Sequence, residues 1–295
     1  MRMSKAESRG FEDHRRDREA GRLLYPVLSR RSEGLSLGVN LFPDRKCCSF
    51  DCPYCEVFPF PESAPFDTER FGTELESFLG TEWSSSWAPE PIRDICISGS
   101  GEPSMSAGLV AAARICAEAR ARHRELLGHS RLVIITNSTG FLSPSGSRGL
   151  AEAQALGFVL WAKLDAGSEE QFRRMSGSGY RFDELVEGIR DYAAIRPITI
   201  QTMLCEVGGH RPDERDLADY RSTLMRLVRG GARIEGLQLY TLARPDRSGS
   251  CRALPDAELL GHASRLRAAL AGEGLKLEVA VYGSRGRLAE GMDRP

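Results

Sequence analysis

The sequence predicts an α/β fold built on a curved sheet or barrel of parallel strands. Short apolar segments alternate with segments of helical periodicity that run for ten residues or more, which is typical of βα units. Six or seven such units follow one another without a dividing linker or an internal repeat. A chain of 295 residues is long enough for one α/β barrel domain. We therefore expect one barrel domain over residues 23–295, preceded by a short N-terminal extension.

The first part of the chain changes character several times. Residues 1–22 are dense in charge and poor in apolar side chains, which predicts a charged tail. In residues 23–44 turn residues separate short apolar runs, and Pro43 ends a first strand over 38–42. The stretch PFPESAP that follows the cysteine-rich loop predicts a rigid spacer.

The remaining elements follow from periodicity and from helix-ending residues such as Gly128. The short apolar runs predict strands over 92–98, 132–136, 158–164, 198–204, 234–241 and 275–281. The longer periodic segments predict helices over 68–80, 105–128, 147–156, 183–194, 213–229 and 255–271.

Alternation along three of the strands predicts which side chains point into the barrel. Apolar positions should meet the outer helices, so the polar positions between them should face inward: Trp161, Lys163, Asp165, Thr199, Gln201, Met203, Cys205, Gln238 and Tyr240. Active sites of such barrels lie at the C-terminal ends of the strands. Asp165, Cys205 and Tyr240 are therefore expected near the mouth.

The composition indicates which class of protein this is. Hydrophobic residues make up 41% and charged residues 27% of the chain, as in soluble globular proteins. No apolar run is long enough for a membrane span, and the charged N-terminus lacks the apolar core of a secretory signal. The scattered cysteines also suit a reducing compartment, so we expect a cytoplasmic protein with no membrane partner. A net charge of −1 provides no global attraction to nucleic acid.

Four of the eight cysteines lie in the stretch KCCSFDCPYCE, residues 46–56. Cys48, Cys52 and Cys55 have C-x3-C-x2-C spacing, and Cys47 immediately precedes them. A structural zinc needs four protein ligands, for which Cys47 or the distant His210 would have to supply the fourth. Iron–sulfur clusters usually take four cysteines, and a cluster held by three leaves one iron open to another ligand.

This motif, with Tyr54 before its last cysteine, resembles the signature of the radical S-adenosylmethionine (radical SAM) superfamily. The resemblance implies a partial (β/α)6 TIM-like barrel and a [4Fe–4S] cluster held by Cys48, Cys52 and Cys55. S-adenosylmethionine (SAM) would chelate the fourth iron and be cleaved to a 5′-deoxyadenosyl radical. Cys47 is expected not to be a ligand.

Further segments match the superfamily in order along the chain. The turn Ser100-Gly101-Glu102-Pro103, after the second strand, resembles the Gly-Gly-Glu-Pro-like turn that contacts the amino group of SAM. Two glycines at 99 and 101 also let a backbone approach a ligand closely. Asn137 is expected at a ribose hydroxyl or a carboxylate, or alternatively as a cap of its own turn.

The barrel interior and mouth offer the other candidates. Lys163 is expected to bind substrate or SAM and Asp165 to contact SAM, unless the two form a purely structural ion pair. Gln201 is a candidate for the ribose or adenine, and Tyr54 and Tyr240 are further cofactor contacts. Arg244 would clamp an anionic substrate or the SAM carboxylate. Cys205 is either a radical donor or an inert buried thiol.

Within the superfamily, the sequence is most similar to the Fe–S oxidoreductases related to the wyosine-tRNA (4-demethylwyosine) synthases. The similarity covers residues 26–281 and rests on PVLSRRSEGLSLGVNLFPDRKCCSFDCPYCE, SGSGEPS, ITNST, KLDAG and LARPD. It implies hydrogen abstraction from an RNA base or a small metabolite, with a flavodoxin or ferredoxin-type electron donor. No second set of clustered cysteines is present, which favours one cluster. The alternatives are a glycyl-radical-enzyme activase with a protein partner and a non-catalytic Fe–S or zinc protein.

Overall fold

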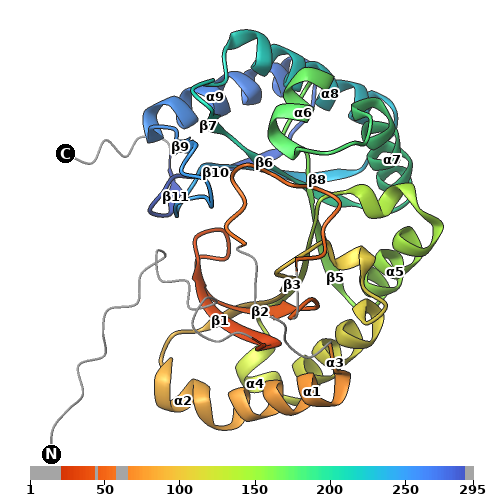
Figure 1. Cartoon of the computed structure of the whole chain (residues 1–295), viewed down its shortest axis with the longest axis vertical. Helices are drawn as coiled ribbons and strands as arrows, with labels where there is room; N and C mark the ends of the chain where they lie inside the picture. Colours follow the sequence, from red (N-terminus) through yellow and green to blue (C-terminus); the bar gives the residue numbers. More distant parts are fainter. Residues whose placement is uncertain (1–20, 44–45, 58–65, 290–295) are drawn as a thin grey trace, which may run out of the picture.

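Parallel strands form the centre of a curled sheet in the computed structural model, which describes residues 21–43, 46–57 and 66–289. The nine strands of the described sheet have the order β1-β2-β3-β4-β5-β6-β8-β10-β11. All neighbouring pairs from β2 to β10 are parallel, and β1 and β11 add antiparallel edges. The fold is therefore the expected α/β partial TIM-like barrel (Figure 1).

The strands of this sheet are β1 (Leu24–Ser29), β2 (Gly34–Asn40), β3 (Ile92–Ser98), β4 (Arg131–Thr136), β5 (Phe158–Lys163), β6 (Ile198–Met203), β8 (Ile234–Tyr240), β10 (Glu278–Tyr282) and β11 (Arg287–Leu288). A separate ribbon pairs β7 (Cys205–Val207) with β9 (Cys251–Ala253) in antiparallel fashion.

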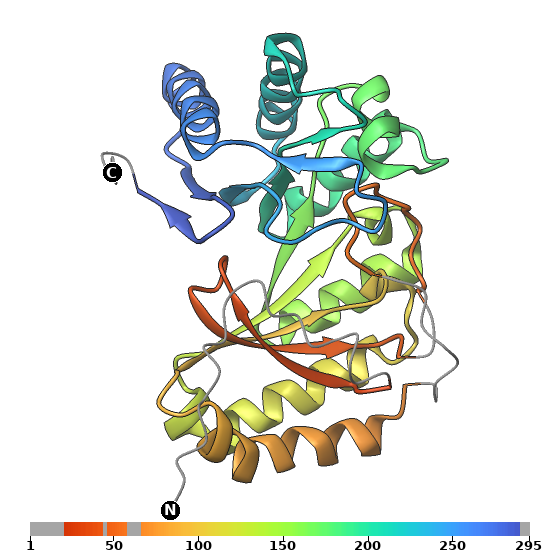
Figure 2. The ribbon, with the colours of Figure 1, turned by 60° about the vertical axis from the view of Figure 1, so that its left-hand side comes forward.

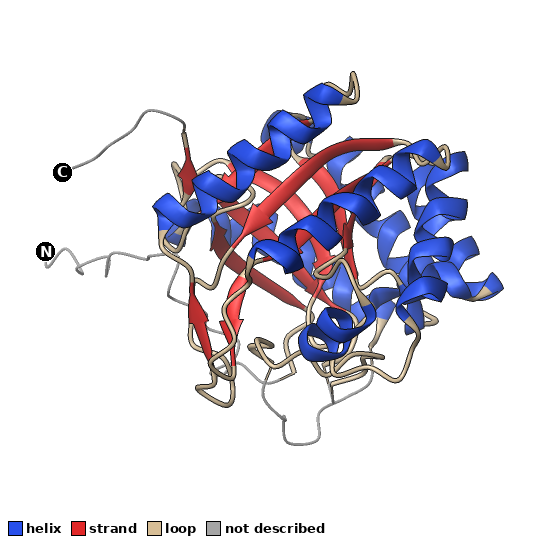
Figure 3. Ribbon diagram, turned by 90° about the horizontal axis from the view of Figure 1, so that it is seen from above, coloured by secondary structure: helices blue, strands red, loops and turns tan. Residues whose placement is uncertain are grey.

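Helices cover the outer face of the sheet, as Figure 3 shows from above. They are α1 (Thr68–Ser77), α2 (Trp83–Ser86), α3 (Leu109–Arg122), α4 (Arg124–Leu127), α5 (Pro144–Ala155), α6 (Glu169–Ser176), α7 (Phe182–Ile195), α8 (Glu214–Arg229) and α9 (Asp256–Gly272). A π-helical segment η2 (Phe78–Glu82) and the 3-10 turns η3 (Pro103–Met105) and η4 (Thr139–Leu142) complete the list. Within the described residues, no helix is both long and apolar enough to cross a membrane.

The two faces of the strands have different neighbours, as the alternation predicts. Ile95 and Ile97 of β3 belong to the large core under the helices, whereas Cys96 packs with Trp161 in a smaller inner cluster. Across the interior, Gln201 Nε2 donates to Gln238 Oε1 at 2.6 Å. The prediction of an inward polar face on β5, β6 and β8 is therefore confirmed.

The N-terminal hairpin departs from the prediction. A strand was expected over 38–42, but β2 begins at Gly34 and pairs with β1, which the sequence reading missed. The aromatic ring of Tyr25 lies across Gly38, where an added Cβ would come within 2.2 Å of it. Glycine is therefore needed at this position because the ring occupies the space of a side chain.

Other differences concern helix ends. The helix expected over 105–128 is divided into η3, α3 and α4, because the backbone leaves helical geometry at His123 (φ −96°, ψ 48°). Helix α6, capped by the Ser168 side chain, was not predicted. The charged tail, apart from its last two residues, and the PFPESAP spacer lie outside the described residues.

The turn between β1 and β2, residues 30–33, is named the hairpin tip, and it reaches the opposite edge of the sheet (Figure 2). Arg30 donates to the main-chain oxygens of Thr241, at 3.1 Å, and of Gly283. Arg287 pairs with Glu33 at 2.9 Å. These contacts join the two ends of the curled sheet through side chains.

Candidate functional site: a cysteine-lined pocket at the barrel mouth

The cysteine loop, residues 46–57, is joined to the loop after β3 by a short parallel bridge. Cys47 N donates to Ser100 O at 3.0 Å, and Glu102 N donates to Cys47 O at 2.8 Å. A Cβ on Gly101 would lie 1.9 Å from Cys47 O. The bridge therefore requires glycine at 101, and Cys47 contributes to it through its backbone.

Two more contacts fix the other parts of the cysteine loop. Asp51 N donates to Ser176 O at the end of α6, at 2.8 Å. Phe50 packs edge to face on Phe172 of the same helix, with ring centroids 5.6 Å apart. Since a loop has few contacts of its own, these anchors define where its thiols lie.

The side chains of the cysteine loop also form ion pairs. Asp51 accepts from Lys46 at 2.7 Å and from Arg247 at 2.6 Å. These two cations, by hydrogen bonding, hold the pKa of Asp51 below its usual value. Glu56, next to Cys55, pairs with Arg244.

A pocket of about 280 Å³ opens at the C-terminal ends of the strands. Eleven of the fifteen residues that the sequence predicts for the site line this pocket. They are Cys48, Cys52, Tyr54, Cys55, Ser100, Gly101, Glu102, Asn137, Lys163, Tyr240 and Arg244. Four others are outside its described wall, namely Pro103, Asp165, Gln201 and Cys205. The structure thus brings most of the candidates together around one cavity.

The three cysteines of the predicted ligand set, Cys48, Cys52 and Cys55, line one pocket. In the described part of the chain, no three His, Cys, Asp or Glu side chains are grouped closely enough to hold one metal ion. The [4Fe–4S] cluster expected on these cysteines stays a prediction. Burial raises the pKa of the Cys48 and Cys52 thiols, that of Cys52 to about 11. Metal binding must therefore displace their protons.

The two residues considered as a fourth zinc ligand, His210 and Cys47, do not line the pocket that contains the other three cysteines. His210 Nε2 is 2.7 Å from an Asp216 oxygen at the start of α8, and it does not belong to the described pocket wall. The Cys47 side chain is not part of that wall either.

Glu102 lines the pocket, is buried, and accepts hydrogen bonds from three donors. Its carboxylate accepts from Thr136 Oγ1 at 2.7 Å, Asn137 N at 2.6 Å and Ser104 N at 3.1 Å. Burial raises the pKa of Glu102 despite these hydrogen bonds. In this arrangement the carboxylate joins the loops after β3 and β4, and its predicted contact with SAM stays a prediction.

Asn137 follows β4 and touches the cysteine loop directly. Its amide nitrogen donates to Ser49 Oγ at 2.8 Å and to Cys48 Sγ at 3.5 Å, and its oxygen accepts from Thr139. Asn137 thus combines the turn-capping role with a contact to a predicted cluster ligand. Its expected contact with a ribose or a carboxylate is untested.

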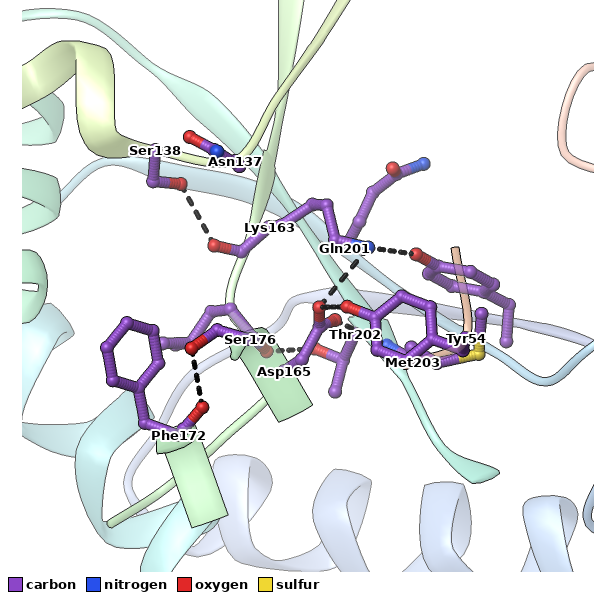
Figure 4. Close-up of polar contacts among 12 residues, drawn as sticks. Tyr54, Asn137, Ser138, Lys163, Asp165, Phe172, Ser176, Gln201, Thr202 and Met203 are labelled. Atoms are coloured by element: carbon purple, nitrogen blue, oxygen red, sulfur yellow. Dashed lines mark hydrogen bonds and ion pairs between the residues drawn. The ribbon is translucent and has the colours of Figure 1, made fainter. Parts of the chain in front are cut away.

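The Lys163–Asp165 pair lies beside Tyr54 of the cysteine loop (Figure 4). Lys163 Nζ is 3.2 Å from Asp165 Oδ2 and 3.0 Å from the Tyr240 hydroxyl. Tyr54, from the cysteine loop, also donates to Asp165 Oδ2, and Met203 N donates to Oδ1 at 2.7 Å. Burial alone would lower the pKa of Lys163, but Asp165 and Tyr240 outweigh it and raise that pKa. The lysine is therefore a fixed cation beside the pocket.

Of the three remaining candidates, Arg244 lines the pocket, whereas Gln201 and Cys205 do not belong to its described wall. Gln201 is fully buried and accepts from Arg31 Nη1 at 3.2 Å. Cys205 is 1% exposed, and burial raises the pKa of its thiol, to which nearby Cys251 adds. Arg244 lies on the pocket wall with Glu56. The roles expected for all three remain predictions.

The sequence reading missed several residues of the pocket. Asn40, at the end of β2, accepts from Ser100 N and Phe42 N at 3.1 Å each. A polar residue that ends an apolar strand was the available signal. Arg30 and Arg31 line the pocket from the hairpin tip, which required knowing how the hairpin folds.

The partial TIM-like barrel is shared with a solved structure, that of a radical SAM methyltransferase from Sphaerobacter thermophilus. The TM-score is 0.59 at 16% sequence identity, over 90% of this chain and 78% of the other. At this identity the likeness concerns the fold.

The chain is also similar in sequence to UPF0026 proteins, whose name states no activity. UPF0026 proteins from two strains of Helicobacter pylori are each 27% identical over 172 residues, which is 58% of this chain and 51% of theirs. A UPF0026 protein of Synechocystis sp. is 26% identical over 200 residues, 65% of this chain and 68% of its own. The chain thus spans about half the length of the Helicobacter relatives. No protein-family model matches the sequence.

Proposed function

We propose that this protein is a radical SAM enzyme that abstracts hydrogen from a small metabolite or an RNA base. The observation that carries the proposal is the position of Cys48, Cys52 and Cys55, which have the superfamily spacing and line one pocket at the barrel mouth. The loop from Ser98 to Pro103, which resembles the SAM-binding turn, is bridged to the same cysteine loop. A solved radical SAM methyltransferase has the same fold, which supports the class.

The three cysteines would hold a [4Fe–4S] cluster. When bound, such a cluster supplies one electron that cleaves SAM to methionine and a 5′-deoxyadenosyl radical. Asn137, by donating to Cys48 Sγ, would stabilise the thiolate charge, and hydrogen bonds to cluster sulfurs raise the reduction potential. The electron would come from a flavodoxin or ferredoxin-type donor in the cytoplasm.

The barrel interior would protect a reactive carbon radical. Tyr54, Lys163 and Tyr240 line the pocket, and their hydrogen bonds leave little freedom for side-chain motion. Lys163 is held in its charged form by Asp165, so it would bind or orient an anionic group rather than take up a proton. Exclusion of water prevents side reactions of the radical.

Iron content separates this proposal from a zinc or non-catalytic reading. After anaerobic reconstitution with iron and sulfide, the protein should hold about four irons and four sulfides per chain. Cys48→Ala, Cys52→Ala and Cys55→Ala should each lose most of this iron. Cys47→Ala is the matched control and should retain it, because Cys47 acts through its backbone.

Two results would count against the proposal. One is a single zinc per chain that survives reconstitution in place of iron. The other is iron loss in Cys47→Ala equal to that in Cys52→Ala, which would show that the ligand set is wrong.

A further inference from the structure

The pocket wall carries more cations than anions. Its lysines and arginines are Arg30, Arg31, Lys46, Lys163 and Arg244, and its carboxylates are Glu56 and Glu102. Three of the cations have a carboxylate partner: Lys46 has Asp51, Lys163 has Asp165 and Arg244 has Glu56. Among the described residues, no carboxylate forms an ion pair with Arg30 or Arg31.

These two arginines are instead held by neutral groups. Arg30 donates to the main-chain oxygens of Thr241 and Gly283. Arg31 donates to the side chain of Gln201, which is itself fixed by Gln238, and its guanidinium lies 4.9 Å from the centre of the Tyr240 ring. Both guanidinium groups are therefore oriented by neutral groups. Two carboxylates act on them electrostatically, Glu56 on Arg30 and Asp94 on Arg31, but neither forms an ion pair with them in the described residues.

The local field adds to this imbalance. Burial, together with the nearby charges of Arg31 and Arg244, lowers the pKa of Arg30 to about 10. Half-buried like charges that have no ion-pair partner are unfavourable, and they are stabilised when an anion binds between them. The planar guanidinium fork matches the oxygens of a carboxylate or a phosphate.

The position of the pair separates it from the cysteines. Arg30 and Arg31 come from the hairpin tip, whereas Cys48, Cys52 and Cys55 come from the cysteine loop, and all five line the same pocket. Glu56, the residue after Cys55, pairs with Arg244, and both of these charges act on Arg30. A molecule held by the arginines would therefore occupy the same cavity as the thiols.

We propose that Arg30 and Arg31 form the subsite for the anionic group of the substrate, a carboxylate or a phosphate. This inference rests on the proposed function, for which it names the substrate class as a small anionic molecule. Arg31 is the binding residue to test, because Arg30 also fastens the hairpin tip to the far edge of the sheet.

Binding of simple anions tests the subsite without any cluster. Inorganic phosphate and acetate, titrated separately at constant ionic strength with chloride as the reference, should each raise the unfolding midpoint of the protein in a saturable way. Arg31→Gln should weaken binding of at least one of these anions fivefold or more. Arg31→Lys, which keeps the charge but loses the fork, should weaken it less. Arg252→Gln, which changes an arginine with a side chain 80% exposed, should leave binding unchanged.

A second measurement separates the substrate from SAM, which has a carboxylate of its own. On reconstituted protein, Arg31→Gln should bind SAM with an affinity within twofold of the wild type in equilibrium dialysis. A tenfold loss of SAM binding would overturn the proposal, because the arginines would then hold the cofactor. Anion binding that is absent, or equal in wild type and Arg31→Gln, would also overturn it.

The two proposals fail in distinguishable ways. If no cluster forms but phosphate or acetate binds through Arg31, the proposed enzyme class is wrong and the anion subsite stands. If the cluster forms and neither anion binds, the class stands and the substrate inference is wrong.

Discussion

The bridge between Cys47 and Gly101 is the contact that places the cysteine loop, and one methyl group tests it. In Gly101→Ala the new Cβ would fall 1.9 Å from Cys47 O and 2.6 Å from Phe42 Cδ2. The first neighbour is backbone, so the loop itself must move.

The expected cost follows from what the movement breaks. Two backbone hydrogen bonds of 3.0 and 2.8 Å would be lost, each worth about 1 kcal/mol. Overpacking adds about 1–3 kcal/mol, so the free energy of unfolding should fall by about 3–5 kcal/mol. Because the cysteines move with the loop, iron bound after reconstitution should fall to less than half.

The matched control is Gly72→Ala in α1. No atom lies within 4 Å of a Cβ added there, and alanine favours a helix interior over glycine by about 0.8 kcal/mol. In urea unfolding, Gly101→Ala should therefore lower the free energy of unfolding, whereas Gly72→Ala should raise it. If Gly101→Ala unfolds at the wild-type urea concentration and binds full iron, the bridge does not determine the position of the loop.

Three further substitutions test the buried charges. Asp165→Asn leaves the buried cation Lys163 without its anionic partner and should cost about 3–5 kcal/mol of unfolding free energy. Lys163→Met should cost less, because Asp165 keeps its donors Tyr54 and Met203. Equal losses in urea unfolding would contradict this. Burial alone would raise the pKa of Asp246, but hydrogen bonds from the Ser248 side chain and from backbone N–H groups lower it. A lowered folded pKa gives stability that is present above the unfolded pKa of about 3.9 and is lost as pH falls through the folded value. Asp246→Asn should lower the free energy of unfolding by about 1–2 kcal/mol at pH 7. It should also make that free energy fall less steeply between about pH 5 and 3. If the fall in this pH range is the same as in the wild type, Asp246 does not contribute.

Much of the fold was predictable because the parallel strands are buried on both faces. The strand expected over 92–98 is β3 residue for residue, because its isoleucines, Ile92, Ile95 and Ile97, favour a strand and are buried in the core. The hairpin of β1 and β2 was not found, because a pair that joins residues 24 and 39 depends on a turn with no strong sequence signal. Helix α6 was missed because it has only eight residues, most of them polar or charged.

The residues of the site, too, fall into those that a local sequence pattern reveals and those that depend on how distant segments meet. The cysteine spacing and the polar residues at strand ends are local patterns, and they identified most of the pocket wall. Arg30 and Gly283 are 253 residues apart and meet only through the closing of the sheet. Whether Gln201 lines the pocket or supports Arg31 depends on the hairpin tip, which no local pattern reveals.

Cleavage of SAM tests the central claim most directly. The protein would be reconstituted anaerobically with iron and sulfide, reduced with dithionite and mixed with SAM, and 5′-deoxyadenosine would be quantified. We predict that it forms, and that Cys52→Ala abolishes it while Cys47→Ala retains it. A reconstituted protein that holds no cluster, or one that yields 5′-deoxyadenosine equally with and without Cys52, would contradict the account.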